Sequence, residues 1–327
     1  MQKTIGRGAL MAAVASVCIA TGAVAQSTYP ERAVKIEVGY AAGGPLDVVA
    51  RLLGDRLAQI WGKPVVVENV SGASGNIAAD RVAKAAPDGY TLLLASNVNI
   101  AVNPKLYKSM PFDPLKDLVP ITQVAFSPNI LVVPNDLPVK TVQELVAYAK
   151  ANPGKLSFAS AGVGTTQHLA GELFKTIAKI DIQHVPYRGA SPVITDLLGG
   201  RVSMFFGPPS SLLGLVKEGK VRALAVTSAR RFPAAPDLPT MIEAGYAGFV
   251  SVLSVGWMAP AGTPKDVIEK IYEDTAKVLR AADVRERLQK IGNEPMGTSP
   301  AEFAADIQVE VPQWAAVIKA AGLTGTE

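Results

Sequence analysis

The sequence predicts an α/β protein of two lobes with a hinge between them. Short apolar runs alternate with amphipathic helical runs in two separate series, over residues 34–95 and residues 129–227, and one more apolar run follows at residues 251–259. We expect residues 26–126 plus 251–327 to form lobe 1 and residues 127–250 to form lobe 2. A lobe interrupted by another lobe implies two chain crossings, where the hinge should lie.

The first strand is expected at residues 34–40. From Pro45 the apolar residues recur at helical spacing, with proline suited to the first helical position and Gly62 to the stop. The further elements expected in this series are a strand at 64–68, a small-residue helix ending near residue 86, a strand at 90–95, short turns over 96–118 and a strand at 120–126. Strand–helix–strand spacing of this kind indicates parallel strands with right-handed crossovers.

The second series begins after Ser127 and Pro128, which separate two strand candidates. Its expected elements are strands at 129–133, 156–159, 182–186, 202–206 and 221–227, and helices at 141–151, 165–178, 191–198 and 210–217. The return strand at 251–259 precedes helices at 264–279, 284–291 and 300–321. In the last helix the predicted buried stripe is Phe303, Ile307, Val311, Trp314 and Ile318, and Pro312 predicts a kink.

Residues 1–25 have the pattern of a secretory signal peptide. Lys3 and Arg7 precede an apolar run, and Ala-Val-Ala precedes Gln26, so we expect cleavage after Ala25 and a periplasmic protein. The only cysteine, Cys18, lies in this segment, so no disulfide is expected in the mature chain. The formal net charge of +4 falls to +2 without Lys3 and Arg7, and no basic run suggests nucleic-acid binding.

The residues that catalysis would need are scarce. The chain has two histidines, His168 and His184, and it lacks the P-loop, the G-x-S-x-G and the H-E-x-x-H patterns. The segment GVGTTQ also lacks the third glycine of a dinucleotide-binding loop. We therefore expect no enzyme activity, no cofactor and no metal, with a Ser-His-Asp hydrolase as the formal alternative.

Two segments have the composition of anion-binding loops, VGYAAGGPLD at residues 38–47 and SFASAGVGTTQH at residues 157–168. In each, a strand ends in glycine and a helix begins, so unpaired N–H groups and the positive end of the helix dipole meet where glycine admits a ligand. The carboxyl ends of parallel strands are where open α/β sheets bind ligands. Two such loops, one per lobe, predict a site for one small carboxylate in the cleft.

The candidate ligand-binding residues follow from this arrangement. They are Tyr40, Ala42, Gly43, Gly44, Asp47, Ser96, Asn97, Asn99, Ala161, Gly162, Gly164, Thr165, Thr166, His168, Arg188 and Gly207. Several have a structural alternative: Asp47 can cap its helix, Thr165 or Thr166 can cap the next one, His168 can orient its loop, and Arg188 can be a solvated surface residue. His184 is expected to be a core or hinge residue.

The chain also resembles a known family in segments that span residues 29–322 in family order. These segments are YPERAVKIEV, AAGGPLDVVAR, PVVVENVSGASGN, APDGYTLL, DPLKDLVPIT, NPGKLSFASAGVGTTQHLAGELF, HVPYRGASPVITDLLGGRV, GKVRALAVTSARRFPAAPDLPTMIEAGY and APAGTP. Together they resemble the Bug family, the TctC-like extracytoplasmic receptors of tripartite tricarboxylate transporters.

The resemblance implies a type II periplasmic binding protein fold that closes on a small organic acid, held by backbone N–H groups, hydroxyls and bridging waters. It implies a monomer that serves membrane permease subunits or, alternatively, a sensor kinase. Two positions depart from the family pattern: Leu46 stands where a threonine is common, and Gly207 where an acidic residue is common. Gly207 argues against an amino-acid ligand, while aliphatic di- or tricarboxylates and aromatic acids stay open.

Overall fold

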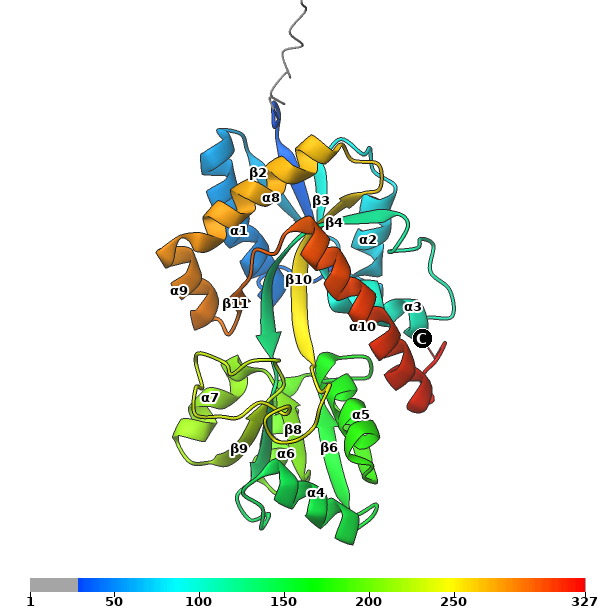
Figure 1. Ribbon diagram of the computed structural model, residues 1–327, viewed down its shortest axis with the longest axis vertical. Coiled ribbons are helices and arrows are strands. Elements are labelled where there is room, and N and C mark those ends of the chain that lie inside the picture. Colours follow the sequence, from blue (N-terminus) through cyan, green and yellow to red (C-terminus); the bar gives the residue numbers. More distant parts are fainter. Residues whose placement is uncertain (1–28, 327) are drawn as a thin grey trace, which may run out of the picture.

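The structure is a computed structural model that describes residues 29–326, so the predicted signal peptide and its cleavage point lie outside the described residues. The described chain forms two lobes, each built on its own sheet, with strand β10 and helix α10 extending toward the junction (Figure 1). Two sheets in one chain confirm the predicted two-lobed α/β class. Among the described residues, no helix is long and apolar enough to cross a bilayer.

Lobe 1 contains a six-stranded sheet in the order β11-β4-β10-β3-β1-β2. Its strands are β1 (Val34–Val38), β2 (Val65–Asn69), β3 (Thr91–Ser96), β4 (Leu118–Pro128), β10 (Val252–Pro260) and β11 (Glu294–Pro295). β1 pairs in parallel with β2 and β3, and β10 lies antiparallel between β3 and β4. The parallel strands therefore bring the loops after β1, β2 and β3 to one edge of the sheet.

Lobe 2 contains a five-stranded sheet in the order β7-β6-β8-β5-β9. Its strands are β5 (Ile130–Pro134), β6 (Leu156–Ser160), β7 (Ile182–Pro186), β8 (Met204–Gly207) and β9 (Val221–Val226). β6 pairs in parallel with β7 and β8, whereas β5 runs antiparallel to β8 and β9. The loops after β6 and β7 consequently lie side by side.

Helices cover both faces of each sheet. In lobe 1 they are α1 (Pro45–Trp61), α2 (Asn76–Ala83), α3 (Asn103–Leu106), α8 (Lys265–Arg280), α9 (Ala282–Lys290) and α10 (Pro300–Ala320), with the 3₁₀ turn η1 (Ala73–Gly75) and the π-helical turn η2 (Val98–Val102). In lobe 2 they are α4 (Val142–Ala151), α5 (Thr166–Ala178), α6 (Ala190–Leu198) and α7 (Pro209–Lys217). α1, α8 and α9 share a buried cluster on one face of the first sheet, and α2, η2 and the first half of α10 share one on the other.

One buried cluster crosses from lobe to lobe. It combines the lobe 2 residues of β5, β6, α4 and α5 with Leu106 of α3 and with Trp314 and Ile318 of α10. The apolar surface that these residues bury between the lobes stabilises the interlobe contact on the side of α10. The lobes are therefore joined by apolar packing as well as by the crossing chain.

The predicted elements are present, with ends that differ by a few residues. The two-residue strand β11 was not expected, because two residues carry no alternation of apolar and polar positions. α10 continues as one helix through Pro312. Of the predicted stripe, Phe303, Ile307, Trp314 and Ile318 are buried and Val311 is only partly buried. The exact lobe boundaries stay a prediction.

Candidate functional site

The first glycine loop (residues 40–47) joins β1 to α1. Gly43 has φ +78°, a conformation that glycine adopts without strain, and Gly44 is the N-cap in extended conformation before Pro45. Ala42 and Gly43 are exposed, so this loop presents backbone rather than bulky side chains to the solvent. Pro45 suits the first turn of this helix, because an N–H group at that position would have no intrahelical partner and proline carries none.

Asp47 fixes this loop from within. Its Oδ2 accepts hydrogen bonds from the Gly43 N–H (2.8 Å) and Arg51 Nε (3.0 Å), and its Oδ1 accepts one from Asn69 Nδ2 (3.0 Å). Burial alone would raise the Asp47 pKa, but the hydrogen bonds from Arg51, Gly43 and Asn69 outweigh it and hold the pKa below its usual value. Asp47 is 3% exposed, and through these hydrogen bonds it braces the loop. The Gly43 N–H consequently points at the Asp47 carboxylate.

Ser96 is the last residue of β3, Asn97 and Asn99 follow the strand, and all three are buried. Asn99 Oδ1 accepts from the backbone N–H of Ser96 (3.1 Å) and from its Oγ (2.9 Å). Asn97 instead holds β10, because its Nδ2 donates to Val252 O and its Oδ1 accepts from Ser254 N–H. Of these three residues predicted to contact the ligand, Asn97 is thus engaged with β10, the strand that returns from lobe 2 to lobe 1.

The loop after β2 is a part of this edge that sequence reasoning did not select. Ala73 and Ser74 have φ of 46° and 51°, which is strained for residues other than glycine. The Ser74 carbonyl accepts hydrogen bonds from Asn99 Nδ2 (2.6 Å), Tyr40 OH (3.2 Å) and Asn103 Nδ2 (3.3 Å). Three donors on one carbonyl oxygen hold the strained turn beside the first glycine loop. The available signal was the Gly-rich SGASG at a strand end.

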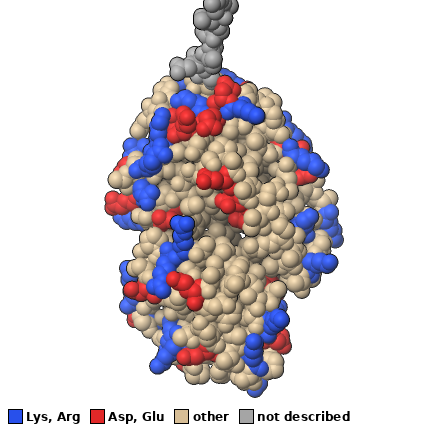
Figure 2. Space-filling model, in the orientation of Figure 1, with Lys and Arg blue, Asp and Glu red and all other residues tan. Residues whose placement is uncertain are grey.

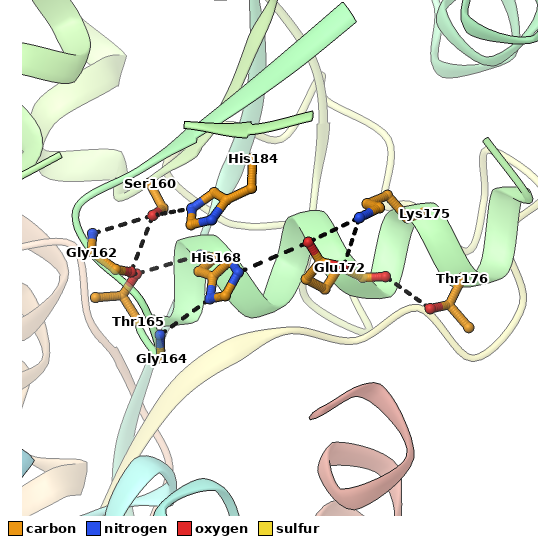
Figure 3. A network of polar contacts seen from close by, with 9 residues as sticks. All are labelled: Ser160, Gly162, Gly164, Thr165, His168, Glu172, Lys175, Thr176 and His184. Atoms are coloured by element: carbon orange, nitrogen blue, oxygen red, sulfur yellow. Dashed lines mark hydrogen bonds and ion pairs between the residues drawn. The ribbon is translucent and has the colours of Figure 1, made fainter. Parts of the chain in front are cut away.

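The second glycine loop (residues 161–168) joins β6 to α5, and Figure 3 shows its polar contacts. Thr165 is the N-cap: its Oγ1 accepts from His168 N–H (3.4 Å) and donates to Gly162 O (2.7 Å). Ser160, the last residue of β6, accepts from the Gly162 N–H (3.2 Å) and contacts His184 Nε2 at 2.7 Å. Thr166 is the first residue of α5 and is partly buried, and the first-turn N–H groups of a helix have no intrahelical partner.

His168 supports the loop from below. Its Nδ1 accepts from the Gly164 N–H (3.1 Å), so the ring proton lies on Nε2, which is 3.9 Å from Glu172 Oε1. His168 is 2% exposed and stacks on His184 with ring centroids 3.9 Å apart. Burial lowers the pKa of His168 to about 3 and that of His184 to about 4, so both rings are neutral at neutral pH. This geometry favours the orienting role of His168.

Arg188 and Ala161 lie in adjacent loops. The Gly189 N–H donates to Ala161 O (3.1 Å), and the Tyr187 N–H donates to Ser160 O (2.9 Å), which joins the loop after β7 to the second glycine loop. Arg188 is exposed and has no ion pair among the described residues. It is therefore a cation beside the loop that could meet a second acidic group.

Gly207 lies differently from the other candidates. It is buried at the end of β8, where it pairs with Ile130, and a Cβ atom there would lie 2.3 Å from the Phe205 ring and 2.6 Å from Leu212. The packing therefore leaves no room for a side chain, which gives a physical reason why an acidic residue does not stand here.

The two lobes touch directly at the second glycine loop. Leu106 of α3 is 3% exposed, and a Cβ atom built on Gly164 would lie 2.7 Å from its Cδ2. Gly164 also has φ +75°. In the space-filling view the molecule narrows where the lobes meet (Figure 2). Leu106 thus brings lobe 1 against the loop that we expect to hold the anion.

Comparison with known proteins decides the family. The family model described as "Tripartite tricarboxylate transporter family receptor" matches residues 49–323. The chain belongs to this family. The receptor is 37% identical to BugT of Bordetella pertussis over 315 residues, which cover 95% of this chain and 97% of BugT.

Solved structures agree with this assignment. "R. palustris Rpa4515 with adipate" is 37% identical with a TM-score of 0.75, over 90% of this chain and 99% of that one. "MatC (Rpa3494) from Rhodopseudomonas palustris with bound malate" is 33% identical with a TM-score of 0.70, over 89% and 100% of the two chains. The family is one of transporter receptors, so the chain is a periplasmic solute receptor and not an enzyme.

Proposed function

We propose that this receptor binds one small organic carboxylate between its lobes, with the two glycine loops on either side, and presents it to a membrane transporter. The observation that carries the proposal is the pair of helix starts, α1 after β1 and α5 after β6, each at the carboxyl end of a parallel strand. That neighbours at 37% and 33% identity hold adipate and malate supports a carboxylate as the ligand.

The ligand class follows from the charges at the site. Asp47 is neutralised by Arg51, and the second glycine loop contains no charged group, so backbone N–H groups and hydroxyls are the main donors for the first carboxylate. Arg188 lies beside the loop and suits a second carboxylate. We therefore favour a dicarboxylate with a short chain.

A thermal-shift screen with mono-, di- and tricarboxylates on the mature protein tests this proposal, because ligand binding to the native state raises the melting temperature. We expect the largest shift with a dicarboxylate. Thr166→Val should reduce the affinity about 3- to 10-fold, the loss of one hydrogen bond to an anion. Thr176→Val is the matched control, since its hydroxyl bonds Glu172 O farther along α5. No shift with any carboxylate would contradict the proposal.

Arg188→Gln separates the ligand classes. We expect it to weaken dicarboxylate binding and to leave monocarboxylate binding unchanged, as measured by calorimetry. An equal loss for both would show that Arg188 contacts no second carboxylate.

We propose further that lobe 1 comprises residues 26–126 plus 251–327, that lobe 2 comprises residues 127–250, and that the mature receptor begins at Gln26 and acts as a monomer. Domain closure on the ligand would present the closed form to permease subunits. The identity of the membrane protein that co-purifies with the receptor, permease subunit or sensor kinase, distinguishes the two partners. Light scattering gives the oligomeric state.

A further inference from the structure

The β2–α2 turn (residues 72–75) carries side chains where its backbone favours glycine. Four consecutive residues have a positive φ, between 46° and 138°: Gly72, Ala73, Ser74 and Gly75. Glycine adopts such values without strain, whereas Ala73 and Ser74 do so at a cost in stability. Ser74 is exposed, so burial of its side chain does not offset this cost.

The backbone of the turn is held in place by neighbouring segments of lobe 1. The Ser74 carbonyl accepts three hydrogen bonds, one of them from the hydroxyl of Tyr40 in the first glycine loop (3.2 Å). A Cβ atom built on Gly39, just after β1, would lie 2.4 Å from Gly75 Cα, so the two loops are in close contact. These contacts involve the main chain of the turn and leave the Ser74 side chain out.

The Ser74 side chain makes one described hydrogen bond, and in it the hydroxyl is the acceptor. Tyr107 OH donates to Ser74 Oγ at 3.4 Å. Among residues 29–326, no group accepts a hydrogen bond from Ser74 Oγ. Because a hydroxyl has one proton and two lone pairs, Ser74 can still donate to an oxygen atom outside the protein.

The Ser74 hydroxyl adjoins both glycine loops. Tyr107 follows Leu106 at the end of α3, and Leu106 is the residue that meets Gly164 of the second glycine loop. The Tyr107 side chain also packs against the apolar cluster that crosses between the lobes. Ser74 thus contacts the first glycine loop through its carbonyl and lies next to the segment that meets the second.

Lobe 1 is short of free donors at this edge. The Gly43 N–H of the first glycine loop already donates to Asp47 Oδ2 (2.8 Å). The Tyr40 hydroxyl and the Asn99 amide both donate to Ser74 O. An anion at this edge therefore needs a donor that these groups do not supply, and the Ser74 hydroxyl is one.

We propose that Ser74 contacts the ligand: its hydroxyl donates a hydrogen bond to a carboxylate oxygen of the acid that lies between the glycine loops. Tyr107 is a positioning residue, because its hydroxyl orients Ser74 Oγ and does not touch the acid. The proposal rests on the receptor function argued above and adds a third loop to the site. The strain at Ser74 then maintains a donor that glycine could not provide.

Calorimetry with adipate and with malate tests this contact in four proteins: the unsubstituted receptor, Ser74→Ala, Tyr107→Phe and the double variant. Ser74→Ala keeps the Cβ atom and removes the donor, so affinity should fall about 3- to 10-fold. Tyr107→Phe should lower affinity by less than this. In the double variant it should add nothing, because its effect passes through the Ser74 hydroxyl.

A merely structural role of Ser74 is separated by the unliganded proteins. The melting temperature of Ser74→Ala should stay within about 2 °C of the unsubstituted value, because the side chain is exposed and its one hydrogen bond is long. Ser71→Ala is the matched control: it removes another exposed hydroxyl, three residues earlier, and should bind both acids as the unsubstituted receptor does.

If Ser74→Ala does not fold, Ser74→Gly replaces it, since glycine adopts this φ without strain and also lacks the hydroxyl. Unchanged affinity in the variant at Ser74, or an equal loss in Ser71→Ala, would overturn the proposal. Additive losses in the double variant would overturn the role of Tyr107. A receptor that binds no carboxylate at all would contradict the proposed function, and the Ser74 contact with it, whereas equal binding with and without the hydroxyl would contradict the Ser74 contact alone.

Discussion

The two glycine loops have the same local plan and are held by different chemistry. In lobe 1 the charged side chain of Asp47 takes the Gly43 N–H and is neutralised by Arg51. In lobe 2 the neutral ring of His168 accepts from the Gly164 N–H in the same way, and the neutral hydroxyl of Thr165 donates to Gly162 O. A glycine loop between a strand and a helix can therefore be held by a charged carboxylate or by neutral side chains. In the lobe 2 loop no carboxylate takes part in the brace, and the nearby Glu172 is paired with Lys175.

The largest effect is expected at the contact between Gly164 and Leu106, which the second glycine loop makes and the first does not. Gly164→Ala should destabilise the protein by about 2–4 kcal/mol, because it combines a left-handed backbone with a clash, and it should remove the carboxylate-induced thermal shift. Denaturant unfolding measures the loss. Gly62→Ala is the control, with φ +62° and nothing within 4 Å, so it reports the backbone cost alone. Equal losses in both variants would mean that the Leu106 contact is unimportant.

The second prediction concerns the neutral histidines of lobe 2. Their pKa values in the folded protein, about 3 for His168 and about 4 for His184, lie below the value near 6.5 of an unfolded chain. The stability that the protein gains by keeping both rings neutral is thus fully present above about pH 6.5, and it is lost as the pH falls toward 4.

His168→Asn keeps an acceptor for the Gly164 N–H and removes the titration. It should abolish about 2 kcal/mol of the acid destabilisation at pH 5, by linkage over 1.5 pH units or so. Unfolding of both proteins at pH 7 and pH 5 measures this. An unchanged pH dependence in the variant would show that His168 is protonated in the folded protein.

The smallest effect is expected in lobe 1. Asp47→Asn should cost about 1 kcal/mol at neutral pH, the size of one hydrogen bond to a backbone N–H. The folded pKa of Asp47 is lowered, so its contribution is present above the unfolded value near 3.8 and disappears as the pH falls through the folded pKa. The difference between the two proteins should therefore vanish in strong acid. A difference that persists there would show that the charge of Asp47 is not its cause.

The elements around the site could be predicted because local chemistry determines them. Pro45 starts α1 and Gly62 ends it, and Thr165 caps α5, as residue types at these positions indicate. The contacts between distant segments could not. Neither the insertion of Leu106 against Gly164 nor the three donors on Ser74 O leave a periodic signal in the sequence.

The candidate ligand residues themselves stay predictions, but the geometry now separates them. Asp47, Asn97 and His168 are buried and engaged with neighbouring groups, whereas Ala42, Gly43 and Arg188 are exposed. Sequence could place all six near the site because each follows a strand end. It could not tell which N–H groups point inward, because that depends on a partner four residues along the helix or on another strand.

The apolar cluster shared by α3, α5 and α10 constrains how this receptor can open. Residues packed across both lobes on one side hold that side together, so we expect the lobes to open by rotation about an axis near α10. The ligand would then enter and leave from the opposite face. A membrane partner that accepts the solute should dock across that opposite face and contact both lobes there at once.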